Sequence, residues 1–188
     1  MRKLIVFNHV TLDGYFVDGN SSMTWAKTNQ NDPEWSAFVA ENSSGEGPLV
    51  FGRITYELMA GYWPTPMAKE HTGALAERMN RLPKVVFSRT MDQAAWSNTR
   101  LVKNDLAGEI RKMKKESGDG IAILGSGSLV SQLSTDGLID EFHFAVNPIV
   151  LGQGRTMFED VKNKLDLKLL RSRAFQNGNV VLVYAPAT

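Results

Sequence analysis

Short apolar runs separated by polar or glycine-containing turns recur along the first two thirds of the chain. Residues 4–7, 49–51 and 121–124 are apolar at every position, which is typical of strands covered on both faces of a sheet. Runs at 84–87 and 100–102 predict two more strands. Because segments with helical signals lie between these runs, the pattern predicts alternating strands and helices and a largely parallel sheet.

The expected helices begin at N-terminal signals. Asp32 is a favoured N-cap and Pro33 is tolerated at the first helical position, so a helix is predicted to begin there. The remaining helices are expected over residues 53–59, from 104 onward and over 128–133. The proline-containing segment 61–81 is predicted to be a surface excursion with one short helix around 74–79.

The last third of the chain changes character. Strands are expected over residues 142–150, 165–175 and 180–184, and the Asn177-Gly178 dipeptide between the last two is a strong hairpin signal. Parallel strand–helix units followed by antiparallel strands predict a mixed sheet.

Composition limits the possible functions. The chain has 188 residues, 43% of them hydrophobic, which suits one core and a single domain over residues 1–188. The chain has 21 Lys and Arg against 20 Asp and Glu, so its net charge does not favour binding to nucleic acid or to a membrane surface. No apolar run approaches the roughly 20 residues of a membrane helix. Cysteine is absent, and the three histidines are scattered, so we expect no metal site and, without a signal-peptide pattern, a cytoplasmic location.

Two glycine motifs lie where a predicted strand gives way to a helix. In Gly52-Arg53-Ile54-Thr55 the first N–H groups of the helix lack partners and its dipole adds partial positive charge, so a pyrophosphate would fit. Leu124-Gly125-Ser126-Gly127-Ser128 is not a Rossmann motif, because Val130 stands where the third glycine would be, and it is neither a P-loop nor a nucleophile elbow. The alternatives are an ordinary capped helix and a tight turn.

The order of four motifs resembles the dihydrofolate reductase-like superfamily, and within it the branch of the riboflavin biosynthesis reductase domain. These motifs are Thr11-Leu12-Asp13-Gly14, Gly52 to Glu57, Val85 to Thr90 and Leu124 to Ser128. The resemblance implies a three-layer α/β/α fold whose mixed sheet has about eight strands and an antiparallel C-terminal hairpin. It also implies NADPH as cofactor, a small-molecule substrate and a homodimer.

The resemblance assigns cofactor contacts to three of the motifs. Ser88, Arg89 and Thr90 would bind the adenosine 2′-phosphate, where the alternative is a polar turn after a strand. The other contacts to the phosphates, ribose and nicotinamide would come from Gly52, Arg53, Thr55, Gly125, Ser126, Gly127 and Ser128.

Substrate-side residues follow from the same resemblance. Asp13 would be a catalytic residue beside the nicotinamide, and the alternative is a plain turn residue. Trp25 and Phe38 would line the substrate cavity, and the alternative for Trp25 is a surface tryptophan on a loop. Glu34 would be the catalytic acid, although an acid in the first turn also simply favours the helix dipole. Leu124 stands where riboflavin-pathway reductases carry an acid, which disfavours their substrate.

The sequence therefore predicts an NADPH-dependent reductase that transfers hydride to a small flat heterocycle, such as a pterin, a folate or an aminopyrimidine. A non-catalytic dinucleotide- or ligand-binding protein of the same fold is the alternative from another class. A flavin-dependent enzyme that uses the same cavity is a third reading.

Overall fold

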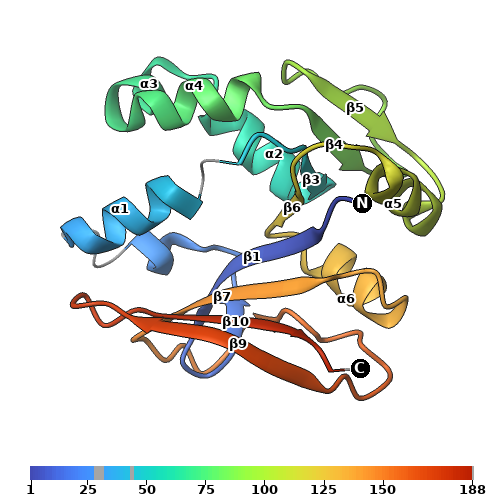
Figure 1. Ribbon diagram of the computed structural model, residues 1–188. Helices are drawn as coiled ribbons and strands as arrows, with labels where there is room; N and C mark the ends of the chain where they lie inside the picture. Colours follow the sequence, from blue (N-terminus) through green and yellow to red (C-terminus); the bar gives the residue numbers. More distant parts are fainter. Residues whose placement is uncertain (28–31, 43–44, 188) are drawn as a thin grey trace.

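An eight-stranded mixed sheet forms the centre of the computed structural model, which describes residues 1–27, 32–42 and 45–187 (Figure 1). Its strand order is β5-β4-β3-β6-β1-β7-β10-β9. The first six strands in this order are parallel, and β10 and β9 follow antiparallel. The strands are β1 (Leu4–Thr11), β3 (Leu49–Gly52), β4 (Lys84–Phe87), β5 (Thr99–Val102), β6 (Ile121–Leu124), β7 (Glu141–Asn147), β9 (Leu167–Ala174) and β10 (Val180–Pro186).

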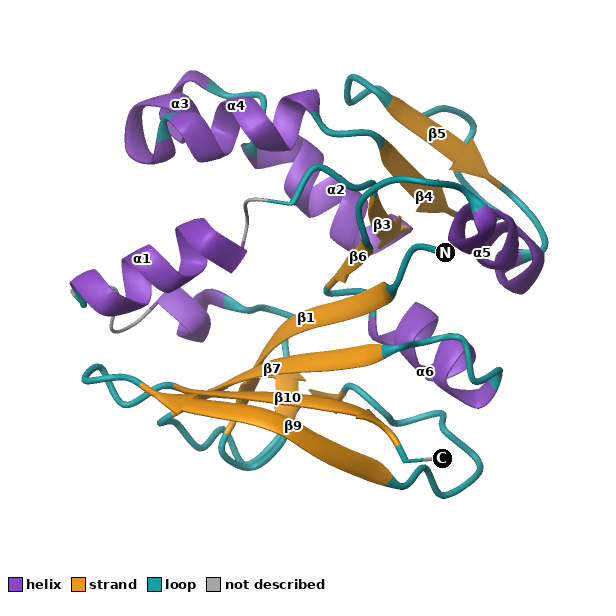
Figure 2. Ribbon diagram, in the orientation of Figure 1, coloured by secondary structure: helices purple, strands orange, loops and turns teal. Residues whose placement is uncertain are grey.

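Helices cover both faces of the sheet and give three layers (Figure 2). Helices α5 (Leu106–Lys115) and α6 (Gly127–Thr135) pack on one face, where Ile110 and Leu133 join a core with Val6 of β1. The opposite face carries α1 (Pro33–Asn42), α2 (Arg53–Tyr62), α3 (Pro66–Thr72) and α4 (Ala74–Arg81). Alternate residues of a strand point to opposite faces of the sheet, and Phe7 of β1 and Phe51 of β3 point to this second face.

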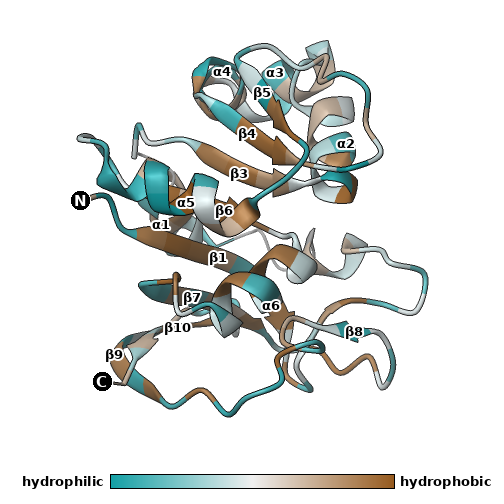
Figure 3. Cartoon of the chain, turned by 90° about the vertical axis from the view of Figure 1, so that its right-hand side faces the viewer, coloured by the Kyte–Doolittle hydropathy of each residue, from teal (hydrophilic) through white to brown (hydrophobic). Residues whose placement is uncertain are grey.

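The expected α/β class, the mixed sheet of eight strands and the antiparallel C-terminal hairpin at Asn177-Gly178 are confirmed. Figure 3 shows the apolar colouring concentrated on β1, β3 and β4, in accordance with the buried runs of the sequence. The helix predicted at Asp32 is also observed, because Asp32 Oδ1 accepts hydrogen bonds from the N–H groups of Glu34 at 2.9 Å and Trp35 at 3.2 Å.

The prediction that residues 61–81 form a surface excursion with one short helix was wrong in one respect. A complete helix, α3, begins after the N-cap Thr65, whose hydroxyl accepts a hydrogen bond from the N–H of Ala68, with Pro66 at the first helical position. The following helix α4 buries Ala76 and Met79. The prolines therefore begin a helix here, and part of this segment belongs to the core.

Three small elements were not predicted as such. They are η1 (Thr24–Lys27), β2 (Tyr15–Val17) and β8 (Arg155–Thr156), the last two of which form a separate two-stranded sheet. The strand expected over 142–150 ends at Asn147. No helix in the described ranges is long and apolar enough to cross a membrane.

Candidate functional site

A cavity of about 760 Å³ lies on the face of the sheet that carries α1 to α4. Ile5 and Phe7 of β1 and Ala122 of β6 form part of its floor, and Val39 of α1 and Met59 of α2 lie on its walls. It extends from the carboxyl edge of the parallel strands to their amino edge. Its volume is in the range of small-molecule and cofactor sites.

The turn after β6 closes the carboxyl-edge end of this cavity. Gly125 and Ser126 both adopt left-handed backbone conformations, with φ of 61° and 59°. The buried side chain of Asn8 holds the turn: its Oδ1 accepts from the N–H of Gly125 at 2.6 Å, and its Nδ2 donates to the Gly125 carbonyl at 3.2 Å. The chain is thereby turned directly into α6.

The same turn is tied to the start of α2. The N–H of Ser126 donates to Thr55 Oγ1 at 3.1 Å, and the N–H of Gly52 donates to Ser126 Oγ at 2.8 Å. A Cβ on Gly125 would come within 2.9 Å of the Thr55 side chain. Neither α2 nor α6 has a described side chain capping its N-terminus. Two helix N-termini therefore meet at one end of the cavity, an arrangement that favours anions such as phosphate.

The structure brings together seven of the ten predicted cofactor residues at this end. These cavity-lining residues are Gly52, Arg53, Thr55, Gly125, Ser126, Gly127 and Ser128. The Arg53 guanidinium is half-exposed and pairs with Glu57 at 2.9 Å, one helical turn away.

The Ser88–Thr90 turn follows the carboxyl end of β4, next to the cavity residue Phe87. Ser88 Oγ accepts the N–H groups of Thr90 at 3.2 Å and Met91 at 3.1 Å, so the hydroxyl shapes the turn. Arg89 is exposed. These three residues do not line the cavity itself, and their cofactor role stays a prediction.

Asp13 is placed to hold a loop. Its carboxylate accepts from the Thr11 hydroxyl at 2.5 Å and from the N–H groups of Leu151 and Gly152 at 3.1 and 2.8 Å. The Thr11 hydroxyl, together with these backbone donors, lowers the pKa of Asp13, so the side chain is ionised at neutral pH. Asp13 does not line the cavity.

The predicted substrate residues also lie outside the cavity lining. Glu34 is half-exposed, and its Oε1 accepts from Arg173 Nη2 of β9 at 2.7 Å. Phe38 packs on Trp35 and Phe175, and Trp25 is buried in η1. The buried setting in which Glu34 could donate a proton is thus not observed, although its role in turnover stays a prediction.

Two polar residues of β1 were missed from the sequence. Asn8 positions the glycine turn, and His9 lines the cavity. Asn147 Nδ2 lies 3.3 Å from His9 Nδ1 and also donates to the carbonyls of Val10 and Ala145. The available signal was the Asn8-His9 pair within a strand that is otherwise apolar over residues 4–10.

Two histidines with lowered pKa values are expected to make the stability of the protein depend on pH. Burial lowers the pKa of His9, and burial also lowers that of His143 although Glu141 acts in the opposite direction. In the unfolded chain these histidines have a pKa of about 6.5. Around and below this pH the unfolded chain therefore binds more protons than the folded one. The melting temperature should fall as the pH decreases from 7.5 to 5.5.

A His9→Gln variant should reduce this pH dependence. His71→Gln, which changes an exposed side chain of α3, is the matched control and should keep the slope of the wild type. Equal slopes in all three proteins, measured by circular dichroism in one buffer series, would show that His9 is not responsible.

Comparison of the sequence with known proteins finds a matching family model and a related protein. The model of the RibD C-terminal domain matches residues 2–181. The uncharacterized protein YyaP of Bacillus subtilis (strain 168) is 31% identical over 184 residues, which cover 97% of this chain and 94% of that protein.

Solved structures share the fold. A provisionally assigned riboflavin biosynthesis protein from Shewanella sp. PV-4 superposes with a TM-score of 0.74 at 22% identity, over 99% of both chains. Dihydrofolate reductase from Enterococcus faecalis, complexed with NADP(H), gives a TM-score of 0.63 at 15% identity over 99% of this chain and 97% of that one. The arrangement of sheet and helices is therefore dihydrofolate reductase-like.

Proposed function

The chain belongs to the RibD C-terminal domain family, and from this premise we propose that it is an NADPH-dependent reductase of a small flat heterocycle. The observation that carries the proposal is the junction at the carboxyl edge. There the N-termini of α2 and α6, joined through Thr55 and Ser126, meet at one end of a 760 Å³ cavity.

The residues at this junction fit a dinucleotide. Its pyrophosphate would be held by the first N–H groups of α2 and α6. Gly125 lets these two helix starts lie close together, because a Cβ there would come within 2.9 Å of the Thr55 side chain. A bound nicotinamide supplies the hydride. The protein would contribute binding, orientation and the exclusion of water.

The apolar part of the cavity supports a flat ring as substrate. Its floor is formed by Ile5, Phe7 and Ala122, and Ile54 and Leu58 on α2 are exposed apolar residues that also line it. Exposed apolar side chains grouped at a concave site are typical of ligand-binding surfaces. A pterin, a folate or an aminopyrimidine would suit these walls.

A turnover screen tests this function. NADPH oxidation should be followed by its absorbance with oxidised pterins, dihydrofolate and aminopyrimidines as acceptors, and a substrate should give a rate proportional to enzyme concentration. Tight NADPH binding without oxidation by any member of these three classes would contradict the proposed substrate class.

Arg89 is expected to select NADPH over NADH. An arginine fork pairs two phosphate oxygens at once, so Arg89→Ala should weaken NADPH binding roughly tenfold or more and leave NADH almost unchanged. Arg111→Ala on α5, on the other face of the sheet, is the control. If Arg89→Ala weakened both cofactors equally in calorimetric titrations, the 2′-phosphate assignment would be wrong.

One observation favours a non-catalytic binding protein as the second candidate. The described residues that line the cavity include no carboxylate, and Glu34 instead pairs with Arg173. Under the enzyme hypothesis with Glu34 as the acid, Glu34→Gln should abolish turnover and leave NADPH binding intact. Unchanged turnover in that variant would remove Glu34 from the mechanism.

A further inference from the structure

A histidine paired with a carboxylate lies beside the floor of the cavity. His143 of β7 lines the cavity and pairs in register with Phe7 of β1, one of the floor residues. Glu141, two positions earlier, pairs with Ile5, another floor residue. Residues two apart along a strand point to the same face of the sheet, so the side chains of Glu141 and His143 both point to the face that carries the cavity.

Glu141 determines which ring nitrogen of His143 holds a proton. Glu141 Oε2 is 2.8 Å from His143 Nε2, and Glu141 Oε1 accepts from Lys3 Nζ at 2.6 Å. Burial would raise the pKa of Glu141, but the hydrogen bonds from Lys3 and His143 lower it overall. Because an ionised carboxylate can only accept hydrogen bonds, Nε2 carries a proton in both the neutral and the charged form of the ring.

The other ring nitrogen, Nδ1, is the one that a ligand can use. It makes no hydrogen bond with the part of the chain that the structure describes. The fully buried polar atoms without a partner in the described ranges include no atom of His143. Although the side chain is only 9% exposed, Nδ1 therefore keeps contact with open space.

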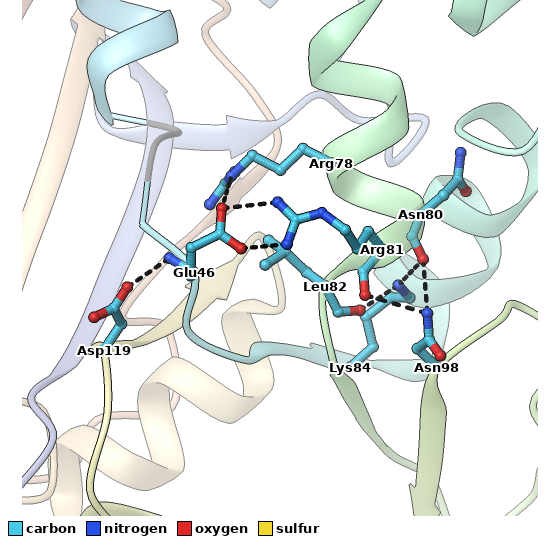
Figure 4. A network of polar contacts seen from close by, with 8 residues as sticks. All are labelled: Glu46, Arg78, Asn80, Arg81, Leu82, Lys84, Asn98 and Asp119. Carbon is cyan, nitrogen blue, oxygen red and sulfur yellow. Dashed lines mark hydrogen bonds and ion pairs between the residues drawn. The ribbon is translucent and has the colours of Figure 1, made fainter.

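The two histidines of the cavity are its candidates for proton exchange. The described lining contains no Asp, Glu, Cys, Lys or Tyr. Its arginines stay protonated in proteins. Arg78, for example, lies 3.8 Å from a carboxylate oxygen of Glu46, which also pairs with Arg81 (Figure 4), so these groups are fixed charges. Histidine is the side chain that titrates near neutral pH, which leaves His9 and His143.

His9 has no carboxylate beside it among the described residues. Its Nδ1 lies 3.3 Å from Asn147 Nδ2, and its ring packs against Phe7 and Trp35 with centroids 5.7 and 5.8 Å apart. Burial lowers the pKa of His9, so the imidazolium is disfavoured there. At His143 the carboxylate of Glu141 balances that charge.

The other groups around His143 make its imidazolium an acid that releases a proton readily. Burial lowers the pKa of His143, Glu141 acts in the opposite direction, and Arg171 and Lys3 lower it further. The neighbouring strand β10 contributes Val183 in register, and α1 packs apolar residues on this part of the sheet. The charged and titratable groups on the surrounding elements are Glu141 of β7, Lys3 before β1, His9 of β1, Arg171 and Arg173 of β9, and Glu34 of α1, which pairs with Arg173.

His143 also lies at a suitable distance from the junction of α2 and α6. Phe7 pairs with His143 on one side and with Leu124 of β6 on the other. Since neighbouring strands lie about 4.8 Å apart, the Cα atoms of His143 and Leu124 are roughly 10 Å apart across the cavity floor. Leu124 directly precedes the Gly125 turn. A flat ring over Phe7 would therefore have His143 on one side and the junction on the other.

We propose that His143 donates a proton from Nδ1 to a ring bound in the cavity, and that Glu141 is the positioning residue that holds the other ring nitrogen. This assignment rests on the proposed reduction of a flat heterocycle. It places the acid on β7 beside the cavity floor, whereas Glu34 lies outside the cavity lining.

Reduction of a ring C=N bond consumes one proton at the nitrogen. A bound reduced nicotinamide supplies the hydride, and with it the electron pair that the carbon and nitrogen take up. The His143 imidazolium gives its Nδ1 proton to that nitrogen. His143 is left as the neutral imidazole with its Nε2–H on Glu141, and a proton from solvent restores Nδ1–H.

Nuclear magnetic resonance of the ring nitrogens tests the contact without turnover. The chain has three histidines, which His9→Gln, His71→Gln and His143→Gln assign. At pH 8, neutral His143 of the wild type should be the Nε2–H tautomer. Saturating pterin or dihydrofolate, with or without NADP⁺, should shift the Nδ1 resonance of His143 and leave that of His71, on the exposed side of α3, unchanged.

Kinetics test the proton transfer. With an acceptor that the turnover screen identifies, His143→Gln should lower kcat roughly 100- to 10,000-fold and leave NADPH affinity unchanged. In the wild type kcat/KM should fall as the pH rises through the pKa that the resonance titration gives for His143. Glu141→Gln should move this midpoint to lower pH, because Glu141 raises the pKa of His143. His71→Gln is the matched control and should keep the wild-type profile.

Three results would overturn the proposal. They are an Nδ1–H tautomer for neutral His143, unchanged His143 resonances with both ring compounds at saturation, and an unchanged kcat in a His143→Gln protein whose melting temperature shows that it is folded. If that variant did not fold, the resonances of the wild type would still decide. Full turnover in His143→Gln would reject the proton donor and keep the reductase function. A ring-induced shift of His143 without NADPH oxidation would reject the reductase function and keep the contact at Nδ1.

Discussion

Gly125→Ala is expected to weaken NADPH binding on the order of 100-fold, because displacing the turn by about 1 Å misplaces both helix N-termini. The new Cβ would come within 2.9 Å of Thr55, whose hydroxyl accepts the N–H of Ser126. Alanine would also have to adopt the φ of 61° that glycine tolerates. Isothermal titration with NADPH measures the loss.

Gly137→Ala is a matched control for the backbone strain. Gly137 has nearly the same φ, 63°, but a Cβ there would meet nothing within 4 Å. Both variants should lose about 1–2 kcal/mol of stability from the left-handed conformation, and only Gly125→Ala should lose NADPH affinity. Equal NADPH affinities in the two variants would argue against a cofactor site at this turn.

Lys84→Met should cause the largest loss of stability. The Lys84 side chain is 1% exposed, and its Nζ donates to the carbonyls of Met79, Asn80 and Leu82 at 2.9, 3.1 and 2.6 Å. It also lies 4.4 Å from the centre of the Trp96 ring. Burial lowers the pKa of Lys84 to about 8, so the ammonium group is still the main form at pH 7.

Methionine has a similar shape but leaves those carbonyls without their donor. The expected loss is about 2–4 kcal/mol, or roughly 5–15 °C in melting temperature for a chain of this size. Lys164→Met, at a side chain that is 83% exposed, should stay within about 0.5 kcal/mol of the wild type. If the two variants melted together, the ammonium would not be what holds the end of α4, the helix that carries Arg78.

Much of the fold follows from local patterns. The buried runs at residues 4–7, 49–51 and 121–124 became β1, β3 and β6 because full burial demands continuous apolar residues. Helix α3 was missed because prolines were taken as breaks, whereas Thr65 and Pro66 form a helix start. The strands β2 and β8 are too short to show an alternating pattern of apolar and polar residues. They pair only because the tertiary structure brings them together, so the sequence did not predict them.

The site was predicted in part. Its glycine turns could be located because positive φ and helix starts leave local sequence signals, as at Gly125. Asn8 could not, because its partner Gly125 lies 117 residues further along the chain. Glu34 was assigned from its place at a helix start, but its partner Arg173 lies 139 residues away on β9, which no local pattern reveals.

Thermal unfolding of the wild type and Gly125→Ala with NADPH, NADH or no ligand tests whether a dinucleotide binds at the junction of α2 and α6. At about 100 times the dissociation constant, NADPH should stabilise the wild type by roughly 2.7 kcal/mol, a shift of about 5–10 °C. NADH should give a smaller shift, and Gly125→Ala should show little with either. An unchanged wild-type melting temperature with both cofactors, or equal shifts in the two proteins, would contradict a dinucleotide site at the junction of α2 and α6.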